Sequence, residues 1–250
     1  MKKYFSLIFL FLILIASILT TDPSIRVMKN IFFTNDTDST EKKQITIVID
    51  PGHGGRDPGK VGVNNALEKD INLSIALKLK NLLELNDIKV IMTREEDVGL
   101  YSETDSNKKR ADMRNRVDLI NTNNVDLALS IHQNSFTQES VKGAQVFYYQ
   151  ASPQGKRLAE IIQAQLIDTM GDGNKRKAKS NTSYYMITRT TCPLVIVECG
   201  YLSNGQEAIL LLEDDYQEKL AWGIHLAVMQ FIKEGGLEGV KGATVTPTQP

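Results

Sequence analysis

Residues 45–60 read ITIVIDPGHGGRDPGK, an apolar run that ends in a turn with four glycines, two prolines and one histidine. The apolar part, residues 45–50, is bounded by turn residues and is rich in isoleucine and valine, which predicts a buried strand. In a sheet covered on both faces, ligands gather at the carboxyl ends of the strands. The turn that carries His53 therefore lies where such a fold places its chemistry.

Strands and amphipathic helices alternate along the rest of the chain. The hydrophobic pattern predicts helices at 67–85, 108–121, 153–170 and 215–233, and further strands at 88–92, 125–131, 143–149, 184–187 and 193–198. This alternation is typical of an α/β fold. We expect a single three-layer domain, with a mostly parallel twisted sheet of about six strands and helices on both faces.

Both ends of the chain are expected to lie outside this domain. Lys2 and Lys3 precede an apolar run at 4–19, which is typical of an export signal, and no small-x-small cleavage site follows. We expect a signal or membrane anchor at 1–21, a linker at 22–43, the folded domain at 44–235 and a disordered tail at 236–250. The protein is then exported, extracytoplasmic and membrane-anchored through residues 4–19.

Charge and cysteine content argue against a nucleic-acid-binding protein and against a structural site built on cysteines. A formal charge of −1 argues against nucleic-acid binding, which needs a basic face. The basic runs at 108–110 and 175–179 are interpreted as solvated surface, with contact to an anionic polymer as the alternative. The two cysteines, Cys192 and Cys199, lie too far apart along an extended segment for a disulfide, and alone they cannot form a structural zinc site.

The opening turn also fits the first seven positions of a phosphate-binding loop, because residues 54–60 read GGRDPGK. That loop needs Ser or Thr after the lysine to hold magnesium, and here Val61 follows. Pro58 removes a backbone N–H group, and Asp57 would repel a phosphate. The sequence therefore favours a different purpose for this turn.

Four polar side chains from distant parts of the sequence fall near the carboxyl ends of predicted strands. His53 and His132 follow two of the strands, Glu198 closes a third, and Glu68 opens the first helix. Two imidazoles and a carboxylate are the ligands of a catalytic zinc ion with one position open for water. The remaining glutamate could act as general base and acid. Periodicity does not separate ligand from base between Glu68 and Glu198.

Each of these residues also has a structural explanation. A histidine after a strand is more often a capping residue than a ligand, and a carboxylate such as Glu68 is stabilised by the dipole at a helix start. Glu198 is harder to explain in this way, because an unpaired charge at the end of a buried apolar run is costly. The third histidine, His225, is interpreted as helix surface or core edge.

Motifs spread over residues 45–234 carry a resemblance to a known family. In order they read IDPGHGG at 49–55, DPG at 57–59, EKDINL at 68–73, TR at 93–94, Arg116 with IN at 120–121, SIHQN at 130–134, and Arg189 with PLVIVECGYLSN at 193–204. The chain resembles the zinc-dependent N-acetylmuramoyl-L-alanine amidases of the amidase-3 type. These enzymes cut the bond between muramic acid and the stem peptide of peptidoglycan.

The resemblance implies roles for five residues. It implies one zinc ion on His53, Glu68 and His132, and Glu198 as the catalytic general base and acid. It also implies that Arg189 lies near the substrate or the developing oxyanion. The substrate would be peptidoglycan, and an accessory protein is a further candidate partner.

The resemblance also suggests a subgroup. We expect neither a wall-binding repeat nor an occluding helical insertion in this chain, and in this it is similar to the sporulation amidases of the family. That similarity implies a role in spore cortex maturation, through muramic-δ-lactam, and in germination. The alternative is a catalytically silent peptidoglycan-binding or scaffold protein with the amidase fold.

Overall fold

The computed structural model describes residues 44–238. The expected anchor at 4–19, the linker to residue 43 and the tail from 239 lie outside the described residues. Within residues 44–238, no helix is both long and apolar enough to cross a membrane. Leu237 packs against the core, two residues beyond the expected end of the domain.

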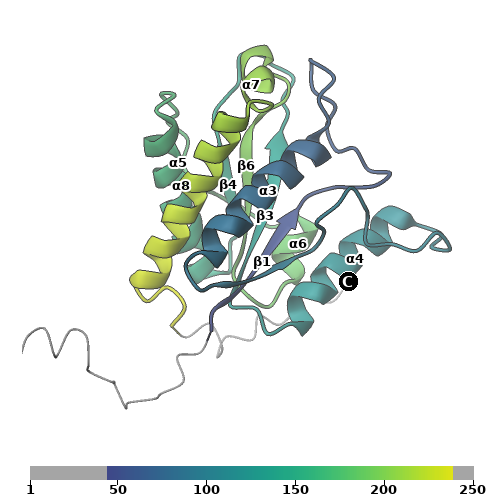
Figure 1. Cartoon of the computed structure of the whole chain (residues 1–250), viewed down its shortest axis with the longest axis vertical. Helices are drawn as coiled ribbons and strands as arrows, with labels where there is room; N and C mark the ends of the chain where they lie inside the picture. Colours follow the sequence, from purple (N-terminus) through teal and green to yellow (C-terminus); the bar gives the residue numbers. More distant parts are fainter. Residues whose placement is uncertain (1–43, 239–250) are drawn as a thin grey trace, which may run out of the picture. The chain divides into compact units, whose positions relative to one another are not determined.

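The centre of the fold is a six-stranded sheet in the order β2-β1-β3-β6-β4-β5 (Figure 1). Strands β2, β1, β3 and β6 pair in parallel, whereas β4 is antiparallel to β6 and parallel to β5. The predicted α/β fold with a mostly parallel sheet is therefore confirmed. The strands are β1 (Thr46–Pro51), β2 (Lys89–Met92), β3 (Leu127–Asn134), β4 (Gln145–Tyr149), β5 (Lys179–Asn181) and β6 (Leu194–Tyr201).

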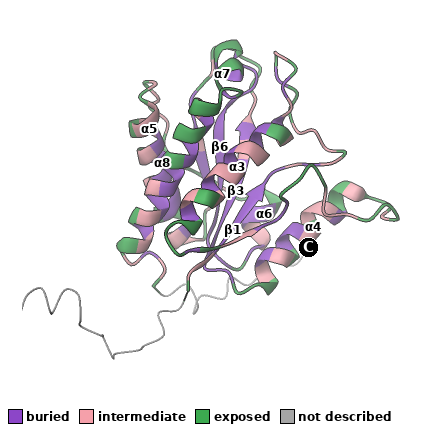
Figure 2. Cartoon of the chain, viewed as in Figure 1, coloured by how far each residue is buried: buried purple, intermediate pink, exposed green. Residues whose placement is uncertain are grey.

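Helices cover both faces of the sheet because the apolar strands alternate their side chains between two cores. Ile47 and Ile49 belong to the core that also contains residues of α3, α5 and α8, whereas Val48 belongs to the core that contains residues of α4 and α6. Figure 2 shows the buried strands lying between helices whose outer faces are exposed. The helices are α3 (Glu68–Glu84), α4 (Lys108–Thr122), α5 (Pro153–Met170), α6 (Tyr185–Arg189), α7 (Gly205–Leu210) and α8 (Asp214–Lys233).

One predicted strand, at 184–187, is wrong. Residues 185–187 lie in helix α6, Tyr184 is the residue just before it, and the edge strand is instead β5. The side chain of Asn181 accepts hydrogen bonds from the backbone N–H groups of Ser183 (2.7 Å) and Tyr184 (2.8 Å), which turns the chain into the helix. A short apolar run cannot be assigned to strand or helix from its periodicity alone.

Strands β3 and β6 continue further than their apolar runs. β3 includes His132 and ends at Asn134, and β6 includes Glu198 and ends at Tyr201. The two strands pair over this polar part, with a register shift between His132 and Asn134. Helix α7, which was not predicted, starts where Asn204 accepts a hydrogen bond from the N–H group of Glu207 (2.9 Å).

Candidate active site

The carboxyl ends of β1, β3 and β6 bring polar side chains to one face of the sheet. Val48, Ala128 and Ile196 belong to the core under α4 and α6. Because side chains two residues apart share a face, His132 and Glu198 continue on the same side as these apolar residues. The two are direct neighbours in the register of β3 and β6.

The turn after β1 places a third polar side chain opposite these two. His53 has a positive φ of 63°, an uncommon conformation for a residue with a side chain. Two nearby glycines leave room for the site. A Cβ atom on Gly52 would lie 2.2 Å from the imidazole of His132, and one on Gly59 would lie 2.6 Å from Oε2 of Glu68. The glycines of the opening motif therefore make a cradle for these side chains.

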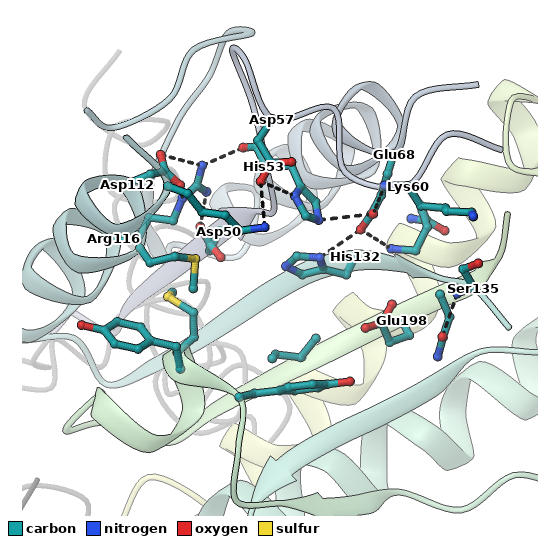
Figure 3. Close-up of a pocket in the computed structure, with 18 residues that line it drawn as sticks. Asp50, His53, Asp57, Lys60, Glu68, Asp112, Arg116, His132, Ser135 and Glu198 are labelled. Atoms are coloured by element: carbon teal, nitrogen blue, oxygen red, sulfur yellow. Dashed lines mark hydrogen bonds and ion pairs between the residues drawn. The ribbon is translucent and has the colours of Figure 1, made fainter. Parts of the chain in front are cut away.

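His53, Glu68 and His132 converge on one point of this cradle (Figure 3). Oε2 of Glu68 lies 3.2 Å from Nε2 of His53, and its Oε1 lies 3.0 Å from Nδ1 of His132. One donor atom from each of the three side chains lies within 4.8 Å of the others. Two imidazoles and a carboxylate at this spacing could hold a metal ion between them.

Backbone groups hold the carboxylate of Glu68 at the start of α3. Its Oε2 accepts a hydrogen bond from the N–H group of Lys60 (2.7 Å), and its Oε1 accepts one from the N–H group of Gln133 (3.0 Å). Burial opposes ionisation, but His132 and His53 hold the pKa of Glu68 well below its usual range. In turn, although burial favours the neutral ring, Glu68 raises the pKa of His132 to about 9. The carboxylate is thus fixed in the charged form that a metal ligand needs.

Glu198 differs from Glu68 in lacking such partners. Its side chain is buried, and among the described residues its Oε2 has no hydrogen-bond partner. Burial raises the pKa of Glu198 to about 7, against the opposing charge of His132. A carboxyl group with a pKa near neutrality is suited to accept and return a proton.

Two buried arginines hold the turn after β1 through its backbone carbonyl groups. Arg116 forms an ion pair with Asp50 (2.7 Å) and donates to the carbonyl oxygen of His53 (2.6 Å). Arg94 also donates to that carbonyl (2.8 Å) and to the carbonyl oxygen of Gly52 (3.0 Å). These bonds satisfy carbonyl groups that the turn leaves without strand partners.

Asp57 orients the imidazole of His53. Its Oδ2 lies 3.0 Å from Nδ1 of His53, while Nε2 of the same ring faces Glu68. A carboxylate on the far nitrogen of a ligating histidine fixes its tautomer and raises its basicity. The i, i+4 spacing of His53 and Asp57 is the signal available in the sequence, where Asp57 is interpreted only as a motif residue and as an argument against phosphate.

A cavity of about 490 Å³ opens onto this cluster. Besides the four polar side chains, it is lined by Lys109 and Met113 from α4 and by Tyr184, Tyr185 and Met186 at the start of α6. A cavity of this size accommodates part of a substrate chain beside the candidate metal ligands.

Arg189 is not brought into this cavity. Its guanidinium lies 5.4 Å from the ring centroid of Tyr185, and Tyr185 itself lines the cavity. A role of Arg189 at the oxyanion therefore remains a prediction. His225 is buried on α8 against Trp222, apart from the cluster, with ring centroids 5.4 Å apart.

Sequence reasoning found the four central residues but missed their supports. Asp50, Arg94 and Arg116 belong to the sequence motifs without a role assigned to them there, and all three are buried. A charged residue inside an apolar pattern is costly without a partner. That pattern was the available signal, and the pairing itself is visible only in three dimensions. The two cysteines are buried and free, as predicted.

The chain is similar to known proteins over most of its described length. Residues 47–230 match the model of the family described as N-acetylmuramoyl-L-alanine amidase. The germination-specific N-acetylmuramoyl-L-alanine amidase of Bacillus subtilis (strain 168) is 38% identical over 193 residues, which cover 76% of this chain and 81% of the relative. N-acetylmuramoyl-L-alanine amidase LytC of the same organism is 32% identical over 75% of this chain and 36% of its own length.

A solved structure is similar in fold as well as in sequence. The CwlD amidase from Clostridioides difficile, solved in complex with the GerS lipoprotein, matches with a TM-score of 0.75 and 38% identity. The match covers 76% of this chain and 100% of that chain.

Proposed function

The chain belongs to the N-acetylmuramoyl-L-alanine amidase family, and on that premise we propose that it works with one zinc ion and acts on the spore cortex. The family name states the reaction: hydrolysis of the amide bond between N-acetylmuramic acid and the L-alanine of the peptidoglycan stem peptide. The observation that carries the zinc proposal is the convergence of donor atoms from His53, Glu68 and His132 within 4.8 Å.

Zinc fits these residues better than other common metal ions do. The site offers two imidazoles and one carboxylate, with neither the thiolate cluster of a structural site nor the oxygen-rich loop of a calcium site. The cradle formed at Gly52 and Gly59 supports the same assignment, because side chains there would displace the ligands. When bound, zinc would supply Lewis acidity, which polarises an amide carbonyl and makes water more acidic.

We assign the proton transfers to Glu198. Its carboxylate lines the catalytic cavity and is held close to His132 by the strand register. It would take a proton from the attacking water and return it to the nitrogen of L-alanine as the amide bond breaks. Burial favours both steps, because a pKa near neutrality lets one group serve as base and then as acid.

The biological setting is proposed from the relatives. The similarity to a germination-specific amidase supports a role in spore cortex maturation and germination. The complex of the similar CwlD amidase with a lipoprotein supports an accessory lipoprotein as partner. The apolar run at 4–19 supports an exported, extracytoplasmic protein that is membrane-anchored through those residues.

The test is digestion of purified peptidoglycan by the purified chain, followed by mass spectrometry of released stem peptides. We expect release with added zinc, loss of release with a chelator, and recovery when zinc is restored. The same digest with a lipoprotein-containing membrane fraction from sporulating cells tests the accessory partner, which should raise the rate. Binding to peptidoglycan without any release, with zinc bound, would instead support the silent scaffold.

A further inference from the structure

A second cavity, of about 390 Å³, adjoins the catalytic cavity. The two cavities share Asn134, at the end of β3, and Tyr184, just before α6. Tyr184 is held in this position by an edge-to-face contact with Phe147, with ring centroids 5.5 Å apart. A substrate chain in the catalytic cavity could therefore continue past Tyr184 into the second cavity.

The second cavity carries two cations from the basic run at 175–179. Arg176 and Lys179 line it, and Phe136 and Tyr201 contribute aromatic walls. Lys175 and Lys177, in the same run, do not line it. Two of the run's charges therefore line the cavity, and its three lysines are exposed, as expected from the sequence.

Arg176 is fixed in place without a carboxylate partner. Its Nε donates to the carbonyl oxygen of Lys142 (3.1 Å), and its Nη1 donates to Oε1 of Gln145 (3.3 Å). Its guanidinium lies 5.0 Å from the ring centroid of Tyr201. Within residues 44–238, no acidic side chain forms an ion pair with Arg176 or with Lys179. A preorganised cation of this kind loses little side-chain freedom when it binds an anion.

The chemistry of the substrate indicates which anion Arg176 and Lys179 would bind. Amide formation consumes the lactyl carboxyl group of muramic acid, whereas the stem peptide keeps at least its terminal carboxylate. We propose that Arg176 and Lys179 form a subsite that binds a free carboxylate of the stem peptide on the leaving-group side of the amide. This inference rests on the proposed amidase function and adds the direction in which the peptide leaves the catalytic cavity.

The kinetic test compares two soluble muropeptides that differ only in their stem, one with free carboxylates and one with carboxamides. The variants are Arg176→Gln, Lys179→Met and the pair together, with Lys177→Met as the matched control from the same run. We expect the paired variant to lose about 10- to 100-fold in kcat/KM on the carboxylate stem, mostly through KM. We expect less than about a twofold change on the carboxamide stem. Arg176→Lys should lose less than Arg176→Gln, because it keeps the charge, although it gives up the guanidinium hydrogen bonds to Lys142 and Gln145.

A binding measurement separates this inference from the amidase function. Free stem peptide is titrated calorimetrically into the zinc-loaded chain and each variant, which needs no turnover. Weaker binding by the paired variant, unchanged binding by Lys177→Met and weak binding of the carboxamide peptide would support the subsite even if no muropeptide were cleaved. Equal losses on both stems, or no loss of peptide binding in the paired variant at an unchanged melting temperature, would overturn it.

Discussion

His132 and Glu198 are register neighbours on the parallel strands β3 and β6, so a candidate metal ligand and a candidate general base lie side by side on one face of the sheet. Their environments differ. Oε1 of Glu68 lies 3.0 Å from the His132 ring, whereas Oε2 of Glu198 has no hydrogen-bond partner among the described residues. This difference supports the separate tasks proposed for the two glutamates, which the sequence pattern alone did not separate.

Replacing Glu198 by glutamine should abolish most turnover without removing zinc. The amide keeps the shape of the side chain but cannot accept a proton, so we expect kcat to fall by about 10²- to 10⁴-fold. Stem-peptide release gives the rate, and elemental analysis gives the zinc content. Glu160→Gln, an exposed change on α5, is the matched control. Full turnover by Glu198→Gln would rule out the assigned role.

Removing either imidazole from the cluster should weaken zinc binding so far that the ion is lost. We expect His53→Ala and His132→Ala to retain far less zinc than the unmodified chain, because each change leaves only two protein ligands. His225→Ala removes the remaining histidine, which is buried on α8 against Trp222, and should keep its zinc. Equal zinc contents in all three variants, after dialysis against a weak chelator, would exclude the proposed ligand set.

Adding a single methyl group at Gly52 should disturb the site through His132. The new Cβ would lie 2.2 Å from the imidazole, so the ring must move. We expect Gly52→Ala to weaken zinc binding and to lower activity by at least about tenfold, in the range seen when the support of a metal ligand is removed. Gly205→Ala is the control, since nothing lies within 4 Å of the corresponding position. Zinc affinity is measured by competition with a chelator. Unchanged affinity in Gly52→Ala would contradict the claim that Gly52 leaves the room that the His132 imidazole needs.

The buried pair of Asp50 and Arg116 should make stability depend on pH in acid. Burial alone would raise the pKa of Asp50, but Arg116, Ser130 and Thr93 together lower it from 3.8 to about 2. The ionised carboxylate therefore stabilises the folded chain above about pH 4, and this stabilisation is lost as the pH falls from about 4 to about 2.

Asp50→Asn isolates this contribution. It should reduce the free energy of unfolding by about 1–3 kcal/mol at pH 6, because Arg116 keeps its ion pair with Asp112 (2.7 Å) but loses its charge-assisted hydrogen bond to the buried Asp50 carboxylate. It should also show a smaller loss of stability than the unmodified chain between pH 4 and pH 2. Urea unfolding at a series of pH values measures both effects. Parallel stability curves for the two proteins would show that Asp50 does not titrate as described.

Part of the fold follows from local pattern. The apolar runs that became β1, β2, β3, β4 and β6 each carry enough buried side chains to specify a strand, and the long amphipathic helices were predicted close to their observed bounds. The elements that were missed are β5, α6 and α7, and at 184–187 the hydrogen bonds of Asn181 start a helix that the short apolar run did not indicate. The polar ends of β3 and β6 were also missed, because pairing between strands decides where a strand stops.

The sequence by itself determined which residue types could do the chemistry: two histidines and two glutamates placed near the ends of strands. Only the tertiary structure decided which of them meet and how each is surrounded, through contacts between residues far apart in the chain. His53 and His132 meet at Glu68 because β1 and β3 are parallel neighbours and α3 starts at their common edge. Burial then separates the two carboxylates: imidazoles in direct contact keep Glu68 charged, whereas at Glu198 burial outweighs the charge of His132 and raises the pKa.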